Sequence, residues 1–547
     1  MTRLNRRRAL LGGSALSVAF LSGVGAGRAE GKTPGGLVGS INALAPDWPE
    51  TVEMFRILIP NWAKLGVSVT AQHATLNTVF AVTAGEHNAP HLTGEGWGGA
   101  PDRIDPDFWL TELFNSRRLA KGGFNYGNYK SERYDSLNNA QREEMDPAKR
   151  IDLIHQSQRM LIEDKPGVTL YYSDYVNPYR TDRIKGVVPI MGSGISLAYI
   201  PWTYLVGEPA GSQTSIRTTT QYDIATLNPF ATGEVQNASL LRWIYAPLVM
   251  RAPDLSLKPW AAESWKVVDP KTVDLTIRGG MKFSDGKPVT VDDLKFTFDF
   301  IAQQKFPSYA RFTEHISRVE VTGERTVRFH LTQPYAPFVA NILGYAFIAP
   351  RHIWEEVAKS AKGSPADWPN DKPVGCGPFR FGKWSKDEYL QLTASPDWFQ
   401  PPKFSEVFWL IVPSIDSQIG MLESGDADMM AWSLTPSQIK RLTSNSAIGV
   451  GRAPSHAPRE IRFNIALAPF DDIAVRRAFS MAIDRPQLVN TLLDGAATIG
   501  DDSFLSPKLP EADQAIKPPE FSIDGARKLL ADAGYTWDSD GKLRYPK

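Results

Sequence analysis

Two short motifs in the sequence carry residue types that could hold a cofactor or a calcium ion. Gly94, Gly96 and Gly99 have the spacing of a dinucleotide-binding loop, but no apolar strand leads into them and Pro101 interrupts the segment that follows. Residues 538–541, Asp-Ser-Asp-Gly, resemble the start of a calcium-binding loop, yet the glycine comes too early and the closing glutamate is missing. We therefore predict a turn at 538–541 and no cofactor at either motif.

Metal, thiol and nucleophile chemistry find equally little support. His87 and His91 are four residues apart, but Pro90 lies between them, so they cannot share a helical face that binds a metal. Cys376 is the only cysteine, which excludes a disulfide within one chain, and we interpret it as a small structural residue. No Gly-x-Ser-x-Gly elbow or paired-carboxylate signature is present. We expect neither a metal nor an enzymatic activity.

The clearest local structure is predicted between residues 260 and 298. Apolar and polar residues alternate on both sides of a turn at 269–271, which predicts a half-buried hairpin with the apolar positions Val268, Val273, Leu275 and Ile277. A tight turn at 284–287 follows. Thr290 is then predicted to cap a helix that has acids in its first turn and apolar residues after them.

This part of the chain also carries a family resemblance. The segment 281–298, MKFSDGKPVTVDDLKFTF, with Ala-Glu-Ser-Trp at 262–265, resembles the signature of the family 5 periplasmic solute-binding proteins. These are the dipeptide-, oligopeptide- and nickel-binding receptors of ABC importers. In that family the signature lies near the mature amino terminus, whereas here it begins after residue 250.

Other motifs also resemble the family, but those that come late in the family come first in this chain. Residues 33–205 resemble the last third of such a receptor, on the motifs at 96–99, 105–109, 125–126, 134–137, 146–164, 170–172 and 185–187. A small, polar, breaker-rich segment follows at 207–212. The beginning of the family pattern appears after it, on the motifs at 226–230, 244–248, 374–379, 425–428, 462–464, 469–472, 475–476 and 482–485.

The two parts together resemble one receptor, so the resemblance implies a circularly permuted chain. Residues 206–213 would join the usual termini, and new ends would open at about Thr33 and Lys547. Permutation is tolerated because the termini of compact domains often lie close together. The alternative is a remnant of two tandem genes whose halves pair between chains as a swapped dimer.

The fold class implied by this resemblance is α/β: a two-lobe periplasmic binding protein of class II with three subdomains and a hinge. Lobe I is predicted to comprise residues 214–432 and the return segment 169–205. Lobe II would comprise 33–168 and 434–547. The hinge crossings are predicted near 432–436 and 166–175.

The resemblance also implies where a ligand binds. Peptide-binding relatives pair an extended ligand with one strand from each lobe. Those strands correspond here to Gly233, Glu234, Val235 and Gln236 in lobe I, and to Trp97, Gly98, Gly99 and Ala100 in lobe II. Glycines allow a ligand backbone to approach closely, and Trp97 would form a wall.

Each of these assignments has a plainer alternative. Trp97 could be a core residue, Glu234 a solvated loop acid, and Trp432, near the predicted crossing, a core or hinge residue instead of a ligand contact. Relatives that bind free peptides carry an aspartate after the tryptophan strand, where this chain has Ala100. The nearest acid is Asp102, which could serve only if the loop shifts by two residues. Free peptides therefore compete with neutral, amidated, sugar-like and opine-like solutes as the predicted ligand.

The predicted function is that of a substrate-binding protein that delivers a small organic solute to an ABC permease of the inner membrane. The alternative is a receptor-derived scaffold or sensory protein that has lost transport. A monomer is expected, with the swapped dimer as its rival.

The amino-terminal segment and the net charge of the remaining chain are typical of an exported protein. Residues 1–29 hold five arginines, an apolar run and a small-residue cleavage site, which predicts a twin-arginine signal, with an ordinary Sec signal as the alternative. The remainder carries 55 basic and 60 acidic residues, which argues against a nucleic-acid partner. We expect a periplasmic protein without a lipid anchor.

Overall fold

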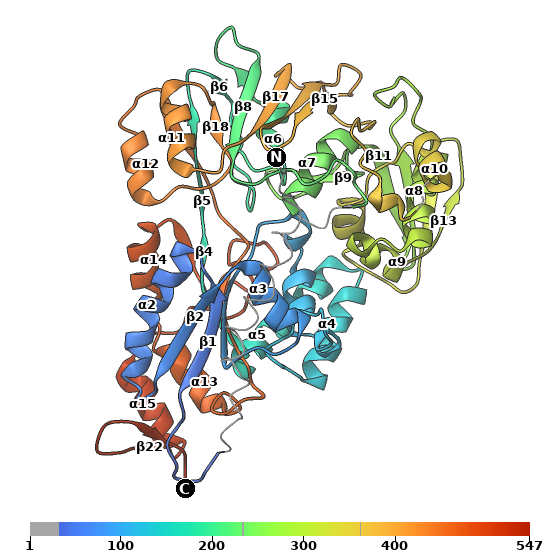
Figure 1. Ribbon diagram of the computed structural model, residues 1–547. Coiled ribbons are helices and arrows are strands. Elements are labelled where there is room, and N and C mark those ends of the chain that lie inside the picture. Colours follow the sequence, from blue (N-terminus) through green and yellow to red (C-terminus); the bar gives the residue numbers. More distant parts are fainter. Residues whose placement is uncertain (1–31, 232–234, 361–362) are drawn as a thin grey trace, which may run out of the picture.

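The computed structural model describes residues 32–231, 235–360 and 363–547. Its elements form three bodies, which we name the lower, upper and side bodies after their places in Figure 1. The predicted export signal, residues 1–29, lies outside the described residues. Within the described residues, no helix is long and apolar enough to cross a membrane.

The lower body is built on a six-stranded mixed sheet with the strand order β2-β1-β3-β20-β4-β21. Its strands are β1 (Ile41–Pro46), β2 (Val69–Ala74), β3 (Leu92–Gly96), β4 (Gly167–Ser173), β20 (Arg459–Phe463) and β21 (Ala497–Ile499). Its helices are α2 (Pro49–Ala63), α3 (Leu76–Phe80), α4 (Glu132–Glu143), α5 (Pro147–Asp164), α13 (Ile473–Met481), α14 (Arg485–Leu493) and α15 (Ile523–Asp532). Because β20 lies between β3 and β4, distant parts of the chain complete one sheet.

The upper body is built on a seven-stranded sheet with the order β15-β16-β17-β8-β18-β5-β19. Its strands are β5 (Tyr175–Arg180), β8 (Ser215–Thr220), β15 (Phe379–Ser385), β16 (Tyr389–Ala394), β17 (Glu406–Ile411), β18 (Met429–Met430) and β19 (Ile448–Ala453). Its helices are α6 (Trp202–Val206), α7 (Val235–Tyr245), α11 (Ile415–Ser424) and α12 (Pro436–Leu442).

The side body is a four-stranded antiparallel sheet with helices packed on it. Its elements are β11 (Ala262–Asp269), β12 (Thr272–Ile277), β13 (Ile316–Val321), β14 (Thr326–Leu331), α8 (Val291–Gln304), α9 (Ala310–His315) and α10 (Arg351–Ser360). Three strand pairs complete the structure: β9 (Val249–Arg251) with β10 (Leu257–Pro259), β6 (Ile184–Lys185) with β7 (Glu208–Pro209), and β22 (Thr536–Trp537) with β23 (Leu543–Arg544).

The local predictions for the 260–298 segment are confirmed in the side body. β11 and β12 form the hairpin. Thr290 caps α8: its hydroxyl accepts from the amide of Asp293 at 3.3 Å, and the Asp293 carboxylate accepts from the amide of Thr290 at 2.9 Å. Val273 is buried as expected, but Val268 is 44% exposed because β11 lies at the edge of its sheet.

The glycine motif near residue 96 is part of a strand and does not follow one. Gly94 and Gly96 lie within β3, whose five residues are all buried. A Cβ atom at Gly94 would lie 2.6 Å from the ring of Phe55, so this glycine lets α2 pack closely on the sheet. The motif therefore has a packing role in the lower body.

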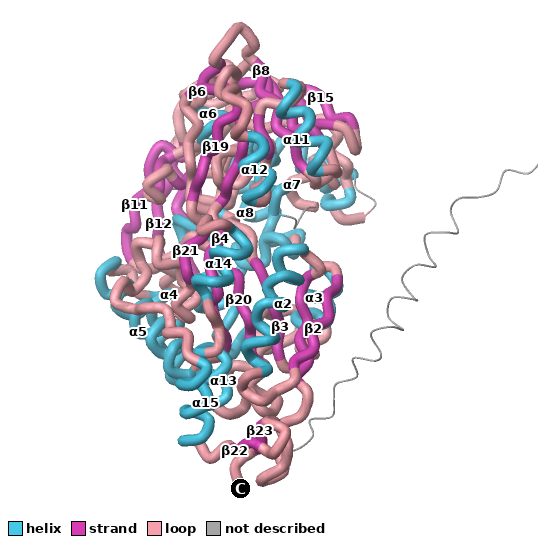
Figure 2. The backbone as a smooth tube through the Cα atoms, turned by 90° about the vertical axis from the view of Figure 1, so that its left-hand side faces the viewer, coloured by secondary structure: helices cyan, strands magenta, loops and turns pink. Residues whose placement is uncertain are grey.

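The chain crosses between the lower and upper bodies twice. The first crossing, from β4 to β5 at Asp174, falls within the predicted range 166–175, although β4 itself pairs with β20 and so belongs to the lower body. The second prediction, near 432–436, was wrong. β19 still pairs with β5 in the upper sheet, so the chain crosses between β19 and β20 at 454–458. Figure 2 shows the two bodies stacked along one long axis.

The first and last described residues lie side by side at the far end of the lower body. The Gly35 amide donates to Pro546 at 3.0 Å, and the Val38 amide donates to Leu543 at 2.8 Å. The carboxy terminus is at the bottom of Figure 1, away from the upper body. The segment 206–213, predicted as a plain linker, contains the short strand β7, which pairs with β6 on the upper body.

Candidate ligand-binding site

Residues 97–100, predicted as the lobe II strand, follow β3 directly but are not part of a strand, so the prediction of a strand was wrong here. The Trp97 indole packs edge-on against Phe108, Phe124 and Trp109, with ring centroids 5.5, 5.3 and 6.1 Å away. Its N–H donates to the Glu460 carboxylate at 2.9 Å, and the residue is 7% exposed. In this conformation Trp97 is a member of an aromatic cluster.

The backbone beyond Trp97 is contacted by other parts of the chain. The Gly98 carbonyl accepts from Arg103 at 3.0 Å, and the Gly99 amide donates to the Tyr175 hydroxyl at 3.3 Å. A Cβ atom at Gly99 would lie 2.1 Å from the carbonyl oxygen of Gly192, so glycine is required for this close approach. A ligand that pairs with this backbone must displace these contacts.

The other predicted ligand contacts are placed as follows. Gly233 and Glu234 lie outside the described residues. Val235 and Gln236 belong to the first turn of α7, so the prediction of an extended strand was wrong for these two positions. First-turn amides lack partners within a helix and remain available to other acceptors.

Three further predicted residues flank this region. Ala100 is buried, and its carbonyl lies 3.3 Å from the Nε2 atom of His456. Asp102 is half-buried in the 3-10 turn Pro101–Arg103. Trp432 is half-buried beside β18, with its ring 5.2 Å from that of Tyr222, so it packs within the upper body.

A pocket lies where the loop after Ala100 meets the upper body. Its volume is about 530 Å³ when adjoining open solvent is counted, but only about 30 Å³ of it admits the centre of a water molecule in this conformation. Pro101 comes from the lower body, and Tyr199 and Trp243 are among the aromatic side chains in the wall. Two arginines, Arg242 and Arg251, line it, and none of its lining residues is acidic. None of the described residues that were predicted as ligand contacts lines the pocket, although Pro101 directly follows Ala100 and Ser239 lies about one helical turn after Gln236.

Neither arginine was predicted as a site residue. The available signal was that Arg242 is the one charged residue in the run 240–250, which is otherwise apolar. Such a residue must either point out of the core or meet a polar partner.

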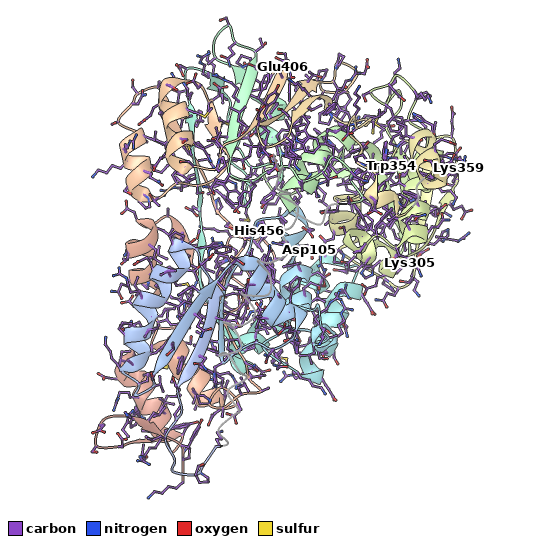
Figure 3. The ribbon with its side chains drawn as sticks, in the orientation of Figure 1. Asp105, Lys305, Trp354, Lys359, Glu406 and His456 are labelled. Atoms are coloured by element: carbon purple, nitrogen blue, oxygen red, sulfur yellow. The ribbon has the colours of Figure 1, made fainter. Side chains whose placement is uncertain are left out.

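Polar groups also meet at the junction of the bodies. Figure 3 shows His456 and Asp105 at the junction of the lower and upper bodies. Arg150 holds Asp105 with two hydrogen bonds, at 3.0 and 2.6 Å. His456 is fully buried in the second crossing, and burial lowers its pKa to about 3, so its ring is neutral.

A second contact joins the lower body to the side body. The Tyr335 hydroxyl donates to the Asp107 carboxylate at 3.0 Å, and Arg142 pairs with the same carboxylate at 2.8 Å. Burial opposes ionisation of Asp107, but Arg142 and the hydroxyl of Thr111 lower its pKa to about 2. These groups are buried while the bodies are together and would meet water if they separated.

Comparisons with known proteins agree with this architecture. The profile of the bacterial extracellular solute-binding proteins, family 5 middle region, matches residues 256–547. The oligopeptide-binding protein AppA of Bacillus subtilis is 30% identical over 311 residues, which are 55% of this chain and 56% of AppA. The glutathione-binding protein GsiB of Escherichia coli K12 is 29% identical over 321 residues, 57% of this chain and 60% of GsiB. The match thus spans less than two thirds of these relatives.

Solved structures show the same fold. NikZ of Campylobacter jejuni, solved with Ni(L-His), has a TM-score of 0.50 at 23% identity and covers 61% of this chain and 66% of its own. A periplasmic oligopeptide-binding protein of Thermotoga maritima has a TM-score of 0.50 at 21% identity, with the same coverage. The fold is therefore that of a two-lobe periplasmic binding protein. On the family profile, which matches more than half of its residues, this chain belongs to the family 5 bacterial extracellular solute-binding proteins.

Proposed function

We propose that this protein is the substrate-binding receptor of an ABC importer and binds a small organic solute between its lobes. The observation that carries the proposal is the pocket at the junction, which has Pro101 of the lower body and Arg242 of the upper body in its walls. A ligand that contacts both bodies shifts the open–closed equilibrium toward the closed form, and the permease can recognise that form.

The names of the relatives support a peptide-like or other polar organic solute. AppA is named for oligopeptides and GsiB for glutathione. The apolar and aromatic walls of the pocket suit the body of such a ligand. We propose that the protein acts as a monomeric, non-catalytic receptor in the periplasm, with its permease in the inner membrane.

Native mass spectrometry of the purified protein tests this function. We expect a monomer that carries a small organic molecule, which mild denaturation releases chemically unchanged. Adding that molecule back should raise the melting temperature of the ligand-free protein. A dimer that binds no solute and shows no thermal shift would instead favour the receptor-derived scaffold.

We also propose that the chain is a circular permutant. The comparisons with AppA, GsiB and NikZ each cover little more than half of this chain, as expected when an alignment in sequence order follows only one of two exchanged blocks. The contact between residues 35–38 and 543–546 supports the same proposal, because a short linker could restore the order of the relatives there.

A rearranged chain tests the permutation. Lys547 is joined to Thr33 through a short linker, and the chain is reopened between Gly207 and Gln213. We expect a monomer whose free energy of unfolding lies within about 2 kcal/mol of the parent, since the new break affects the two-residue pair β6–β7 and leaves both large sheets intact. A control reopened inside β20 should fail to fold, because that strand is central in its sheet. Failure of the first chain to fold would count against an intramolecular permutant.

A further inference from the structure

Arg242 is a buried cation for which the described residues supply no carboxylate. It is 8% exposed, and its guanidinium group lies over the Tyr345 ring, with 4.2 Å between the guanidinium carbon and the ring centroid. One terminal nitrogen donates to the Ser239 hydroxyl at 2.8 Å. The other terminal nitrogen is buried without a hydrogen-bond partner. Burying an uncompensated charge is costly, so this arrangement indicates a missing anion.

The position of Arg242 on α7 places it in the walls of two pockets. Ser239, Arg242 and Trp243 follow helical spacing and line the pocket of about 530 Å³ at the junction. Arg242 also lines a second, nearly filled space, whose walls include Tyr245, Tyr309 and Tyr345. Arg242 therefore lies in the walls of both spaces, with its unpaired terminal nitrogen buried in this conformation.

Arg251, the other arginine of the junction pocket, has carboxylates near its charge. Its Nε atom is also buried without a hydrogen-bond partner. Burial lowers the pKa of Arg251, and Arg150 adds to this, but the carboxylates of Asp105 and Glu511 oppose it. Asp105 and Glu511 thus offset part of the cost of burying the charge of Arg251.

We propose that Arg242 binds the carboxylate of the solute, and that the solute is a small organic acid with an apolar or aromatic body. The planar guanidinium group matches a carboxylate, and a charge-assisted hydrogen bond is strong where water is excluded. The aromatic and aliphatic walls offer apolar surface for the rest of the ligand. This inference rests on the proposed receptor function and specifies one chemical group of its ligand.

Benzoate and benzamide test the site, because they differ in charge and little in shape. Protein freed of co-purified solute is titrated with each at constant ionic strength, and the melting temperature is followed. Wild-type protein should gain thermal stability from benzoate at millimolar concentration and little from benzamide. Arg242→Met should bind benzoate roughly 10-fold to 100-fold more weakly, while Arg242→Lys should retain part of the effect.

Arg318→Gln is the matched control. It removes one positive charge from β13, where the Arg318 side chain is 63% exposed, and should respond to benzoate as the wild type does. Without ligand, Arg242→Met should melt at the same or a higher temperature than the wild type, because it removes an uncompensated buried charge. Equal benzoate responses in wild type and Arg242→Met, or no benzoate-specific response in the wild type, would overturn the proposal.

The outcome for this site can be separated from that for the receptor function. If native mass spectrometry finds a solute that Arg242→Met binds as tightly as the wild type, the receptor function stands and the carboxylate site fails. If benzoate stabilises the wild type through Arg242 but no solute is found, the site stands and the receptor function lacks its support.

Discussion

Replacing Asp502 with asparagine is expected to lower the free energy of unfolding by roughly 3–5 kcal/mol, because it breaks a buried ionic network. Asp502 is fully buried and accepts from Arg485 at 2.7 Å and from Lys165 at 3.1 Å. The Ser480 hydroxyl, at 2.6 Å, and the Thr169 amide, at 2.9 Å, complete its hydrogen bonds. Without the carboxylate, two buried cations would lose their counter-charge.

The Asp502 network joins elements that are far apart in the sequence. Lys165 and Thr169 lie at the end of α5 and in β4, whereas Ser480, Arg485 and Asp502 come from α13, from α14 and from the loop after β21. Loss of the network should loosen that junction in the lower body. Limited proteolysis should therefore cut the variant near these elements before the whole protein unfolds.

Asparagine separates the effect of charge from that of backbone strain. Asp502 has a φ of 63°, a left-handed conformation that asparagine also adopts readily. The control is Asp532→Asn, which breaks an exposed pair with Lys528 and should cost less than about 1 kcal/mol. Urea unfolding at neutral pH measures both. A loss of less than about 1 kcal/mol in Asp502→Asn would show that the network contributes little.

The Asp502 network should also shape the response to acid. Burial opposes ionisation, but Arg485 and Lys165 hold the pKa of Asp502 below its ordinary value of 3.8. Its stabilising contribution is therefore present above pH 3.8 and is lost as the pH falls through the lower pKa of the folded state. The asparagine variant should lack this part of the acid-induced loss.

The sequence predicted the parts of the fold whose signals are local. The hairpin at 262–277 follows from alternation, and the start of α8 follows from Thr290 and Asp293 three residues apart. The second crossing was misplaced because β19, with two glycines in six residues, has a weak local signal. Its place in the upper sheet depends on β5, which is far away in the sequence.

The site was predictable only where the family pattern points to it. The segment 97–100 does follow β3 toward the upper body. The contacts of Gly99 come from Tyr175 and Gly192 and that of Ala100 from His456, which no local pattern connects to this segment. Arg242 was missed for a similar reason. A helical arginine is usually solvated, and only tertiary packing leaves this one buried without a carboxylate.

Beneath Trp97, the cross-strand pair Glu95 and Glu460 is expected to make the stability of the protein fall as the pH rises. The two residues face each other on β3 and β20 and are buried. Arg462 pairs with Glu460 at 3.0 Å. Burial and the charge of Glu460 raise the pKa of Glu95 from 4.5 to about 8, and Tyr126 and Arg462 only partly offset this. Glu95 is therefore protonated in the folded protein at neutral pH.

The sign follows from proton linkage. Between about pH 4.5 and 8 the folded state holds a proton on Glu95 that the unfolded state has released, so stability decreases by up to about 1.4 kcal/mol per pH unit. The stability that comes from the proton on Glu95 is fully present below pH 4.5 and is lost as the pH rises through 8. Glu95→Gln keeps a neutral side chain at every pH and should remove this dependence.

Urea unfolding of wild type and Glu95→Gln at pH 5, 6, 7 and 8 measures the effect. The two proteins should have similar stability at pH 5, and the variant should be more stable at pH 8 by on the order of 3 kcal/mol. Glu324→Gln, at an exposed turn residue, should follow the wild type at every pH. Parallel curves for wild type and Glu95→Gln would mean that Glu95 is ionised in the folded protein. In that case Glu95 would place a second negative charge beside the Glu460 carboxylate, which accepts the hydrogen bond of the Trp97 indole.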